Sequence, residues 1–180
     1  MIVPAEVVEY DPRWPLWFEE IRARLTPYLG DLPHQLEHVG STAVPGLAAK
    51  PIIDVDVVVP TAELVPPAIE RLVAAGYLHE GDQGIPGREA FALPSDTDHY
   101  HHLYVVVEGN KPHRDHTVLR DHLRTNAADR ERYAVRKREL AHLLTTDRPA
   151  YVDGKSALVE ELIATAGGSQ PVGGPRRTGS

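Results

Sequence analysis

His38-Val39-Gly40-Ser41-Thr42, followed shortly by Asp54-Val55-Asp56, is the part of the chain that says most about its fold. Both aspartates lie inside the apolar run 51–59, which is rich in β-branched residues and predicts a buried β-strand. Because side chains alternate across a strand, Asp54 and Asp56 point to the same face. Two carboxylates on one face of a buried strand are costly unless a cation lies between them, and oxygen ligands favour magnesium.

The Gly40-Ser41 turn supplies the second half of a phosphate-binding site. Glycine has no Cβ, so its backbone can approach a ligand closely, and the N–H groups of such a turn can hold phosphate oxygens. The hydroxyl of Ser41 can donate one further hydrogen bond. Taken alone, a Gly-Ser pair is a common turn. Joined to two carboxylates in an apolar strand, it predicts the metal and phosphate site that nucleotidyl transfer requires.

The same motifs resemble those of a known family. Gly40-Ser41 followed by Asp54-x-Asp56 resembles the signature of the DNA polymerase β-like nucleotidyltransferase superfamily. The string 38–56, His-Val-Gly-Ser-Thr-Ala-Val-Pro-Gly-Leu-Ala-Ala-Lys-Pro-Ile-Ile-Asp-Val-Asp, resembles the GrpB family within it. The resemblance runs from about residue 6 to about residue 166. Its other segments are Tyr10-Asp11-Pro12-x-Trp14, Gly84-Ile85-Pro86-Gly87-Arg88, His102-Leu103-Tyr104-Val105, Leu119-Arg120-Asp121-x-Leu123-Arg124 and Tyr133-x-x-x-Lys137.

The resemblance implies an α/β (α+β) fold of the minimal nucleotidyltransferase type: a small mixed sheet, helices on one side of it and a C-terminal helical segment. It implies that Asp54 and Asp56 hold Mg²⁺, and that Gly40, Ser41 and Thr42 hold the phosphates of a nucleoside triphosphate, with ATP as the expected donor. Arginine forks and lysine point charges suit phosphate oxygens, although any one of them can equally belong to a solvated basic face. The basic residues expected around the nucleotide are Lys50, Arg88, Arg120, Lys137 and Lys155.

A third carboxylate, which many members of the superfamily carry on a neighbouring strand, is missing from its expected place. The strand predicted for 101–108 begins with two histidines instead. His102 lies on the less apolar face of that strand, so it is predicted to face the site as a metal-adjacent ligand or a proton acceptor. It can equally be a structural histidine, and Asp98 and Glu108 are weaker substitutes for the acid.

Clustered histidines raise a rival hypothesis. The chain has ten histidines, six of them within 99–122. A zinc or other transition-metal site built from this group is the alternative to magnesium. Its candidate ligands are His99, His101, His102, His113 and His116. Their spacing matches no established zinc signature, which argues against it.

Composition limits the classes of partner. The 180 residues carry a formal net charge of −7, which argues against a nucleic acid as partner, since nucleic-acid-binding proteins are usually basic. There is no apolar run long enough to span a membrane, no visible secretory signal and no cysteine, so a cytoplasmic location is expected. Neither the Rossmann nor the P-loop glycine pattern is present.

One domain is expected over residues 1–166, followed by a disordered, low-complexity tail at 167–180. An edge strand or extended arm at 3–9 precedes an amphipathic helix that reaches Tyr28, with Asp11 as its N-cap and Pro12 at its first position. A second helix is predicted from a Thr61 cap to Ala75. Further strands are predicted at 35–39, 52–59, 77–79, 88–93 and 101–108, and further helices at 112–125, 127–144 and 155–166.

These features predict a magnesium-dependent enzyme that transfers a nucleoside monophosphate from a nucleoside triphosphate to a small-molecule acceptor, with Asp56 or His102 taking the acceptor's proton. Two alternatives use the same site. One is a ligase that adenylates a carboxylate and passes the acyl group to an amine. The other is a nucleotide-binding accessory module with little turnover, which the missing third acid favours.

Overall fold

The computed structural model of the chain describes residues 3–168 and is built on a five-stranded sheet with the order β1-β2-β5-β4-β3. Its strands are β1 (Gln35–Val39), β2 (Ile53–Val59), β3 (Leu78–Gly81), β4 (Arg88–Ala92) and β5 (His101–Val107). β2 and β5 run parallel, and the other pairings are antiparallel. The mixed sheet confirms the predicted fold class. Residues 169–180, most of the predicted tail, lie outside the described residues.

The two parallel strands set the register of the site. β2 is buried along almost its whole length, which explains why valine and isoleucine fill it. In the ladder Asp54 lies opposite His102, and Asp56 lies opposite Tyr104. Because paired residues point to the same face, all four side chains share one face of the sheet, with neighbouring strands ~4.8 Å apart.

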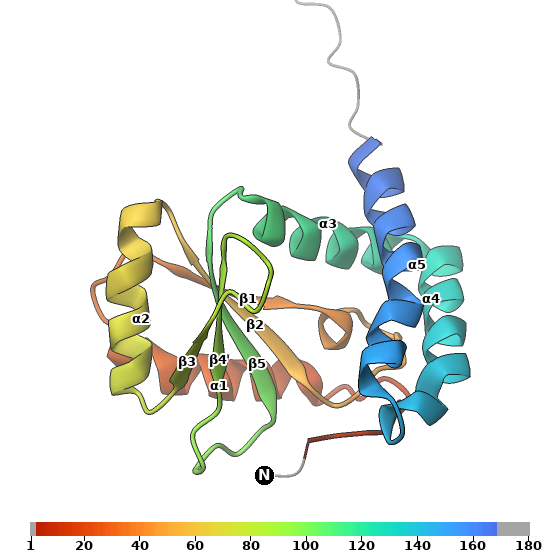
Figure 1. Cartoon of the computed structure of the whole chain (residues 1–180), viewed down its shortest axis with the longest axis horizontal. Helices are drawn as coiled ribbons and strands as arrows, with labels where there is room; N and C mark the ends of the chain where they lie inside the picture. The colour runs from red at the N-terminus through yellow and green to blue at the C-terminus, as the bar shows by residue number, and fades with distance from the viewer. Residues whose placement is uncertain (1–2, 169–180) are drawn as a thin grey trace, which may run out of the picture.

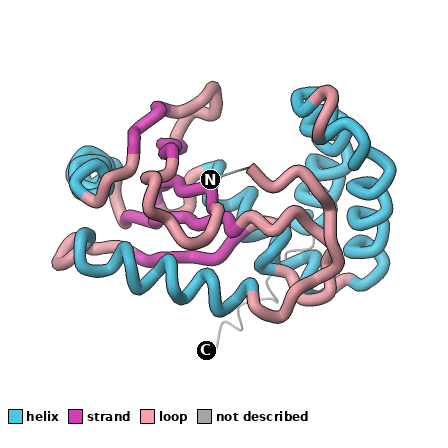
Figure 2. The backbone as a smooth tube through the Cα atoms, turned by 90° about the horizontal axis from the view of Figure 1, so that it is seen from below, coloured by secondary structure: helices cyan, strands magenta, loops and turns pink. Residues whose placement is uncertain are grey.

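Helices α1 (Trp14–Leu29) and α2 (Val65–Ala74) cover the opposite face of the sheet, and the main hydrophobic core lies between them and the strands (Figures 1 and 2). The buried residues of α1 recur every three or four positions, which gives the helix one apolar stripe. That stripe packs with Ile53, Val55 and Val57 of β2 in one cluster. The odd-numbered side chains of β2 therefore fill the core and leave the even-numbered aspartates on the other face.

Three further helices pack together beside the sheet (Figure 1): α3 (Lys111–Thr125), α4 (Ala127–Leu140) and α5 (Arg148–Gly168). A second hydrophobic cluster holds them, and it includes Leu123 and Tyr133. Val44 and Leu47, from the loop between β1 and β2, are buried in the same cluster. The loop 40–50 is thus anchored in the helical part, which holds the Gly-Ser turn against the carboxylate strand.

The predicted C-terminal helical segment packs on the face of the sheet opposite the one that α1 and α2 cover. α3 contacts β1 and β5, and its His116 hydrogen-bonds Asp56 on the face opposite the main core. The N-terminal segment 3–9 is an extended arm with no strand of its own, and a single bridge joins Val8 to Ala49.

The first helix begins later than predicted. α1 starts at Trp14, and the carboxylate of Asp11 accepts hydrogen bonds from the backbone N–H and the guanidinium of Arg13. Pro15, rather than Pro12, lies in the first turn of the helix. The prediction of Asp11 as N-cap was therefore wrong, because its carboxylate closes the turn that precedes the helix.

Two later helix starts also differ. Thr61 gives α2 no cap, since a short 3-10 turn, Ala62–Leu64, comes between them. α5 begins at Arg148 rather than 155 and continues through Gly168, so the predicted domain end at 166 falls inside a helix. No helix within residues 3–168 is long and apolar enough to cross a membrane.

Candidate active site

Asp54 and Asp56 share a face of β2 but differ in their surroundings. The side chain of Asp54 is 26% exposed, and that of Asp56 is 0% exposed. His102 on β5 donates from Nδ1 to Asp54 at 2.8 Å, and His116 on α3 donates from Nδ1 to Asp56 at 2.8 Å. The second oxygen of Asp56, Oδ1, is buried without a hydrogen-bond partner among the described residues. A buried carboxylate oxygen of this kind suits a cation.

Histidine neighbours stabilise the negative charge of Asp54. Burial alone would raise the pKa of Asp54, but the hydrogen bond from His102 and the charges of His102, His116 and His38 lower that pKa below its ordinary value. Burial alone would lower the pKa of His116, but its hydrogen bond to Asp56 and the charges of both aspartates raise that pKa. These surroundings therefore favour the ionised form of Asp54 and the protonated form of His116.

Gly40 holds the loop against the carboxylate. Its φ of +70° lies in a region that side chains rarely adopt. A Cβ on Gly40 would come within 2.7 Å of Cγ and 2.9 Å of Cβ of Asp54, so the position has room for glycine only. The close backbone approach expected of this glycine is therefore made to Asp54, and the two residues form one wall of a cavity.

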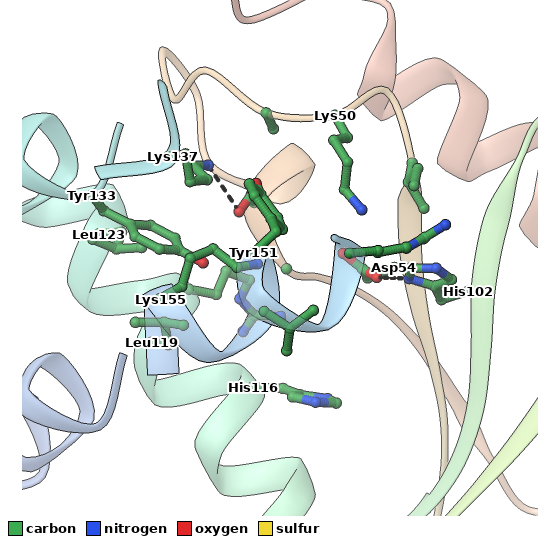
Figure 3. A pocket seen from close by; sticks show the side chains of 17 residues that line it. Lys50, Asp54, His102, His116, Leu119, Leu123, Tyr133, Lys137, Tyr151 and Lys155 are labelled. Carbon is green, nitrogen blue, oxygen red and sulfur yellow. Dashed lines mark hydrogen bonds and ion pairs between the residues drawn. The ribbon is translucent and has the colours of Figure 1, made fainter. Parts of the chain in front are cut away.

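That cavity, of about 280 Å³, opens beside Asp54 between the sheet, the loop 40–50 and helices α3, α4 and α5 (Figure 3). The predicted site residues that line it are Gly40, Ser41, Lys50, Asp54, His102, Arg120, Lys137 and Lys155. Its other polar or aromatic lining residues are His116, Tyr133, Arg148 and Tyr151. Among the described lining residues, five basic side chains therefore face a single carboxylate.

Lys137 is the most deeply buried of these cations. Its Nζ donates to Oγ of Ser41 at 3.1 Å and lies 4.5 Å from the ring centre of Tyr133. Burial, followed by the charge of Lys155, lowers the pKa of Lys137 well below its ordinary value. Within residues 3–168 it forms no ion pair, so its charge is left for a ligand.

Lys50 and Lys155 line the same cavity, and both lie close to the ring of Tyr151. Their Nζ atoms lie 5.6 Å and 4.6 Å from the centre of that ring. Figure 3 shows Lys50 pointing toward Asp54. Burial, with the charges of Arg148 and Lys155, lowers the pKa of Lys50 to about 8, and burial also lowers the pKa of Lys155. Cations held together in this way suit a polyanion such as a triphosphate.

Thr42 and Arg88, both predicted to bind the nucleotide, do not line the cavity. The hydroxyl of Thr42 is buried and donates to the carbonyl of Ile52 at 3.1 Å, which ties the loop to the carboxylate strand. The guanidinium of Arg88 lies 4.4 Å from the ring centre of Tyr104. Both residues are therefore neighbours of the site and not part of its wall.

Arg120 lines the cavity but is already engaged. Its NH1 group donates to Glu37 at 3.0 Å and to the carbonyl of His38 at 3.2 Å. A further ion pair joins it to Asp121. Arg120 thus joins α3 to β1 by hydrogen bonds. These bonds hold its guanidinium in place, and its positive charge lies beside the cavity.

The clustered histidines do not form one metal site. His102 and His116 bind the two aspartates. The other three have partners of their own: Glu20 for His99, Tyr77 for His101 and Glu37 for His113. Within residues 3–168, no group of three or more His, Asp or Glu side chains is arranged to hold a metal ion. The structure therefore gives no support to the zinc hypothesis.

His102 occupies the place where a third acid was expected. His101, its neighbour, lies on the opposite face and is 1% exposed, in line with the predicted division of β5 into two faces. Neither Asp98 nor Glu108 lines the cavity beside Asp54. The position next to Asp54 thus carries an imidazole, which can bond the carboxylate with one nitrogen and a ligand with the other.

Comparison with known proteins identifies the family. The model of the GrpB protein family matches residues 4–165. The chain belongs to the GrpB family. It is 38% identical over 161 residues to UPF0157 protein BH1888 of Halalkalibacterium halodurans, covering 89% of this chain and 81% of that protein. It spans only 46% of the length of another relative, UPF0157 protein YqkA of Bacillus subtilis, with which it is 34% identical.

Solved structures show the GrpB fold and a more distant likeness. The crystal structure of GrpB from Enterococcus faecalis matches with a TM-score of 0.77 and 32% identity, covering 89% of this chain and 96% of that one. A mutant of the Cid1 poly(U) polymerase, bound to MgATP, matches with a TM-score of 0.50 and 12% identity, covering 73% and 45%. At that identity the likeness shows the nucleotidyltransferase fold alone.

The residues of this GrpB site fit a magnesium ion. Asp54 and Asp56 project from one face of one strand, and Oδ1 of Asp56 is buried without a partner among the described residues. Mg²⁺ usually binds through one or two carboxylates and completes its shell with phosphate oxygens and water. Two aspartates are therefore enough to hold the ion when a triphosphate is present.

Two residues of the site had a weak signal in the sequence. The sequence places His116, the partner of Asp56, on one helical stripe with Arg120 but indicates no role for it beyond that of a zinc ligand. Tyr151 lies in a stretch that was assigned to no element. Asp147, whose side chain accepts from the N–H of Ala150 at 3.0 Å, marks the helix start that would have revealed it.

The lysines predict a pH-dependent affinity for ATP. Lys50 has a pKa of about 8 in the free protein, and a bound triphosphate would raise that pKa, so binding takes up protons near and above pH 8. In the absence of magnesium, affinity should fall as the pH rises above 8, by up to ~10-fold per pH unit for each lysine that must take up a proton. Calorimetry in two buffers of different ionisation enthalpy measures the proton uptake. Lys50→Met should flatten the dependence, and a constant wild-type affinity up to pH 10 would contradict the assignment.

Proposed function

We propose that this protein transfers a nucleoside monophosphate from a nucleoside triphosphate, with ATP as the expected donor, to a small-molecule acceptor in a magnesium-dependent reaction. The observation that carries the proposal is the cavity in which Asp54, the Gly40-Ser41 turn and five basic side chains face one another. The fold shared with a polymerase that was crystallised with MgATP supports it.

The cavity accounts for the triphosphate part of the donor. Lys50, Lys137 and Lys155 would neutralise the phosphates, and the turn would add backbone N–H groups. The nucleoside would extend into an adjoining cleft of about 350 Å³ between α3 and α5, which shares lining residues with the first cavity. Leu119 and Val152 line both spaces, and their apolar side chains suit the face of a base.

The reaction is an in-line substitution at the α-phosphorus. The acceptor's hydroxyl oxygen forms a bond to that phosphorus while the bond to the bridging oxygen breaks, and pyrophosphate leaves. Magnesium held by Asp54 and Asp56 would offset the charge on the phosphates. His102 is better placed than Asp56 to take the acceptor's proton, since its side chain is 33% exposed and lines the cavity. With Nδ1 donating to Asp54, Nε2 is the atom that accepts the proton.

Titration of the purified protein with ATP, GTP, CTP and UTP, with and without magnesium, tests the proposal. We expect magnesium-dependent binding of a triphosphate, and pyrophosphate release when an acceptor is added. Release of AMP together with an amide product would favour the ligase alternative. Tight binding without pyrophosphate release would favour the accessory module, and no binding at all would contradict the proposed site.

Lys137→Met is expected to weaken the binding of MgATP and, at the same time, to increase the stability of the free protein. It should weaken MgATP binding at least ~10-fold, because it removes a buried charge that faces the phosphates. It should also stabilise the free protein by about 1 kcal/mol, because a buried cation without a counter-ion is costly. Calorimetry and denaturant melts measure the two effects. Arg132→Met, on the exposed face of the same helix, is the control; equal MgATP affinity in both variants would refute the role of Lys137.

A further inference from the structure

A second cavity, of about 270 Å³, lies on the same face of the sheet, on the far side of β5 from the first. Ala90 and Ala92 of β4 line it, and their small side chains leave a hollow beside the larger side chains of Tyr100 and Tyr104. His102 lines both cavities. The imidazole of His102 thus lies between the first cavity, which is lined by lysine and arginine, and a second cavity, whose described lining residues include neither.

We propose that this second cavity binds the acceptor, and that the acceptor is a small hydroxyl compound with an amino group, such as an amino alcohol or an amino sugar. The inference rests on the proposed function, because it assigns the second substrate of that reaction. Position, charge and size support it separately.

The position of the cavity suits an attacking oxygen. Asp54 and His102 are direct neighbours in the parallel ladder, on strands ~4.8 Å apart. Tyr104 continues the same row beside Asp56. A hydroxyl group held in the second cavity therefore lies next to His102, on the strand that neighbours Asp54.

Charge distinguishes the two cavities. Five basic side chains line the first, whereas the described residues that line the second include no lysine or arginine and one carboxylate, Glu80, at its exposed rim. Gln83 donates to that carboxylate at 2.7 Å. Arg88 lies over Tyr104 but does not line the space. A carboxylate and tyrosine rings favour an ammonium group and disfavour a phosphorylated acceptor.

The size of the cavity limits the acceptor. At ~30 Å³ for each water in the liquid, 270 Å³ corresponds to roughly nine water molecules. A single sugar ring or a short amino alcohol fits such a space, and a polymer does not. The acidic net charge of the chain agrees with an acceptor that is not a nucleic acid.

Saturation-transfer NMR on the full chain tests the assignment, with glucosamine, glucose and glucose 6-phosphate as probes, in the presence and absence of MgATP. We expect glucosamine to bind best and glucose 6-phosphate worst. Ala92→Leu, which fills the hollow, should abolish the glucosamine signal, and Glu80→Gln should weaken binding several-fold. Glu89→Gln is the matched control and should change nothing, because Glu89 lies on the neighbouring strand β4 and pairs with His79 on the opposite face. Circular dichroism checks that each variant is folded.

Three results would overturn the inference: no binding of glucosamine, binding that survives Ala92→Leu, or a preference for the phosphorylated sugar. The proposed function is tested separately by MgATP titration of the same samples. If MgATP binds and glucosamine does not, the acceptor assignment fails while the proposed function stands. If glucosamine binds in this cavity but no triphosphate binds the wild type, the proposed function fails, and the acceptor role fails with it.

Discussion

Asp54→Asn combined with Asp56→Asn is expected to abolish magnesium-dependent nucleotide binding while the fold stays intact. Asparagine keeps the shape of each side chain and can still accept from His102 and His116, but it removes both negative charges. Without them the cation loses its two protein ligands. We expect MgATP affinity to fall by roughly 100-fold or more, which corresponds to ~2.7 kcal/mol.

Calorimetry with ATP, in the presence and absence of magnesium, measures this effect on the double variant and on each single variant. Asp54→Asn alone should cost more than Asp56→Asn alone, because Asp54 lines the cavity and Asp56 lies behind it. Asp153→Asn, on α5 outside the cavity, is the control for charge. If the double variant binds MgATP as tightly as the wild type, the two aspartates are not metal ligands.

The carboxylate strand and its faces could be predicted because both depend on local pattern. The valines and isoleucines of 51–59 predict a buried strand. Because side chains alternate between the two faces of a strand, Asp54 and Asp56 are then predicted to lie on the same face. The same reasoning placed His102 and His101 on opposite faces of β5. In each case a few consecutive residues decide the outcome, and no distant contact is needed.

Contacts between distant elements could not be predicted in this way. Nothing in α3 alone says that His116 meets Asp56, sixty residues away in sequence. Thr42 lies in the expected loop, yet its hydroxyl turns toward the carbonyl of Ile52 and not toward the cavity. Arg88 is basic and near the site, but the ring of Tyr104 determines where its guanidinium lies. These outcomes depend on packing, which periodicity does not encode.

The site lies between the sheet and the three C-terminal helices, and this explains its chemistry. The sheet supplies Asp54, and the helical part supplies four of the five cations: Arg120 from α3, Lys137 from α4, and Arg148 and Lys155 from α5. The loop 40–50 joins the two parts, since Val44 and Leu47 are buried among the helices while Gly40 touches Asp54. A change that separates loop and strand would therefore disrupt both the metal and the phosphate halves of the site.

Gly40→Ala is the substitution that makes this change, and we expect it to cost both stability and binding. The backbone conformation of Gly40, with a φ of +70° and a ψ of −168°, is essentially restricted to glycine and costs about 1–3 kcal/mol for a residue with a Cβ. The added Cβ would also overlap the carboxylate of Asp54. Either this carboxylate must then move away from His102, or the loop 40–50 must move away from the strand. We expect a total loss of ~2–4 kcal/mol in the free energy of unfolding, measured by urea denaturation, and the loss of magnesium-dependent ATP binding.

Gly109→Ala is the matched control for this substitution. Gly109 has the same φ of +70°, but nothing lies within 4 Å of the position its Cβ would take. It should therefore show the backbone cost alone, about 1–2 kcal/mol, with MgATP affinity unchanged. The difference between the two variants isolates the contact between the turn and the carboxylate. If the two variants lose equal stability and bind MgATP with equal affinity, the contact between Gly40 and Asp54 does not position the carboxylate. The loop 40–50 would then have no role in holding Asp54.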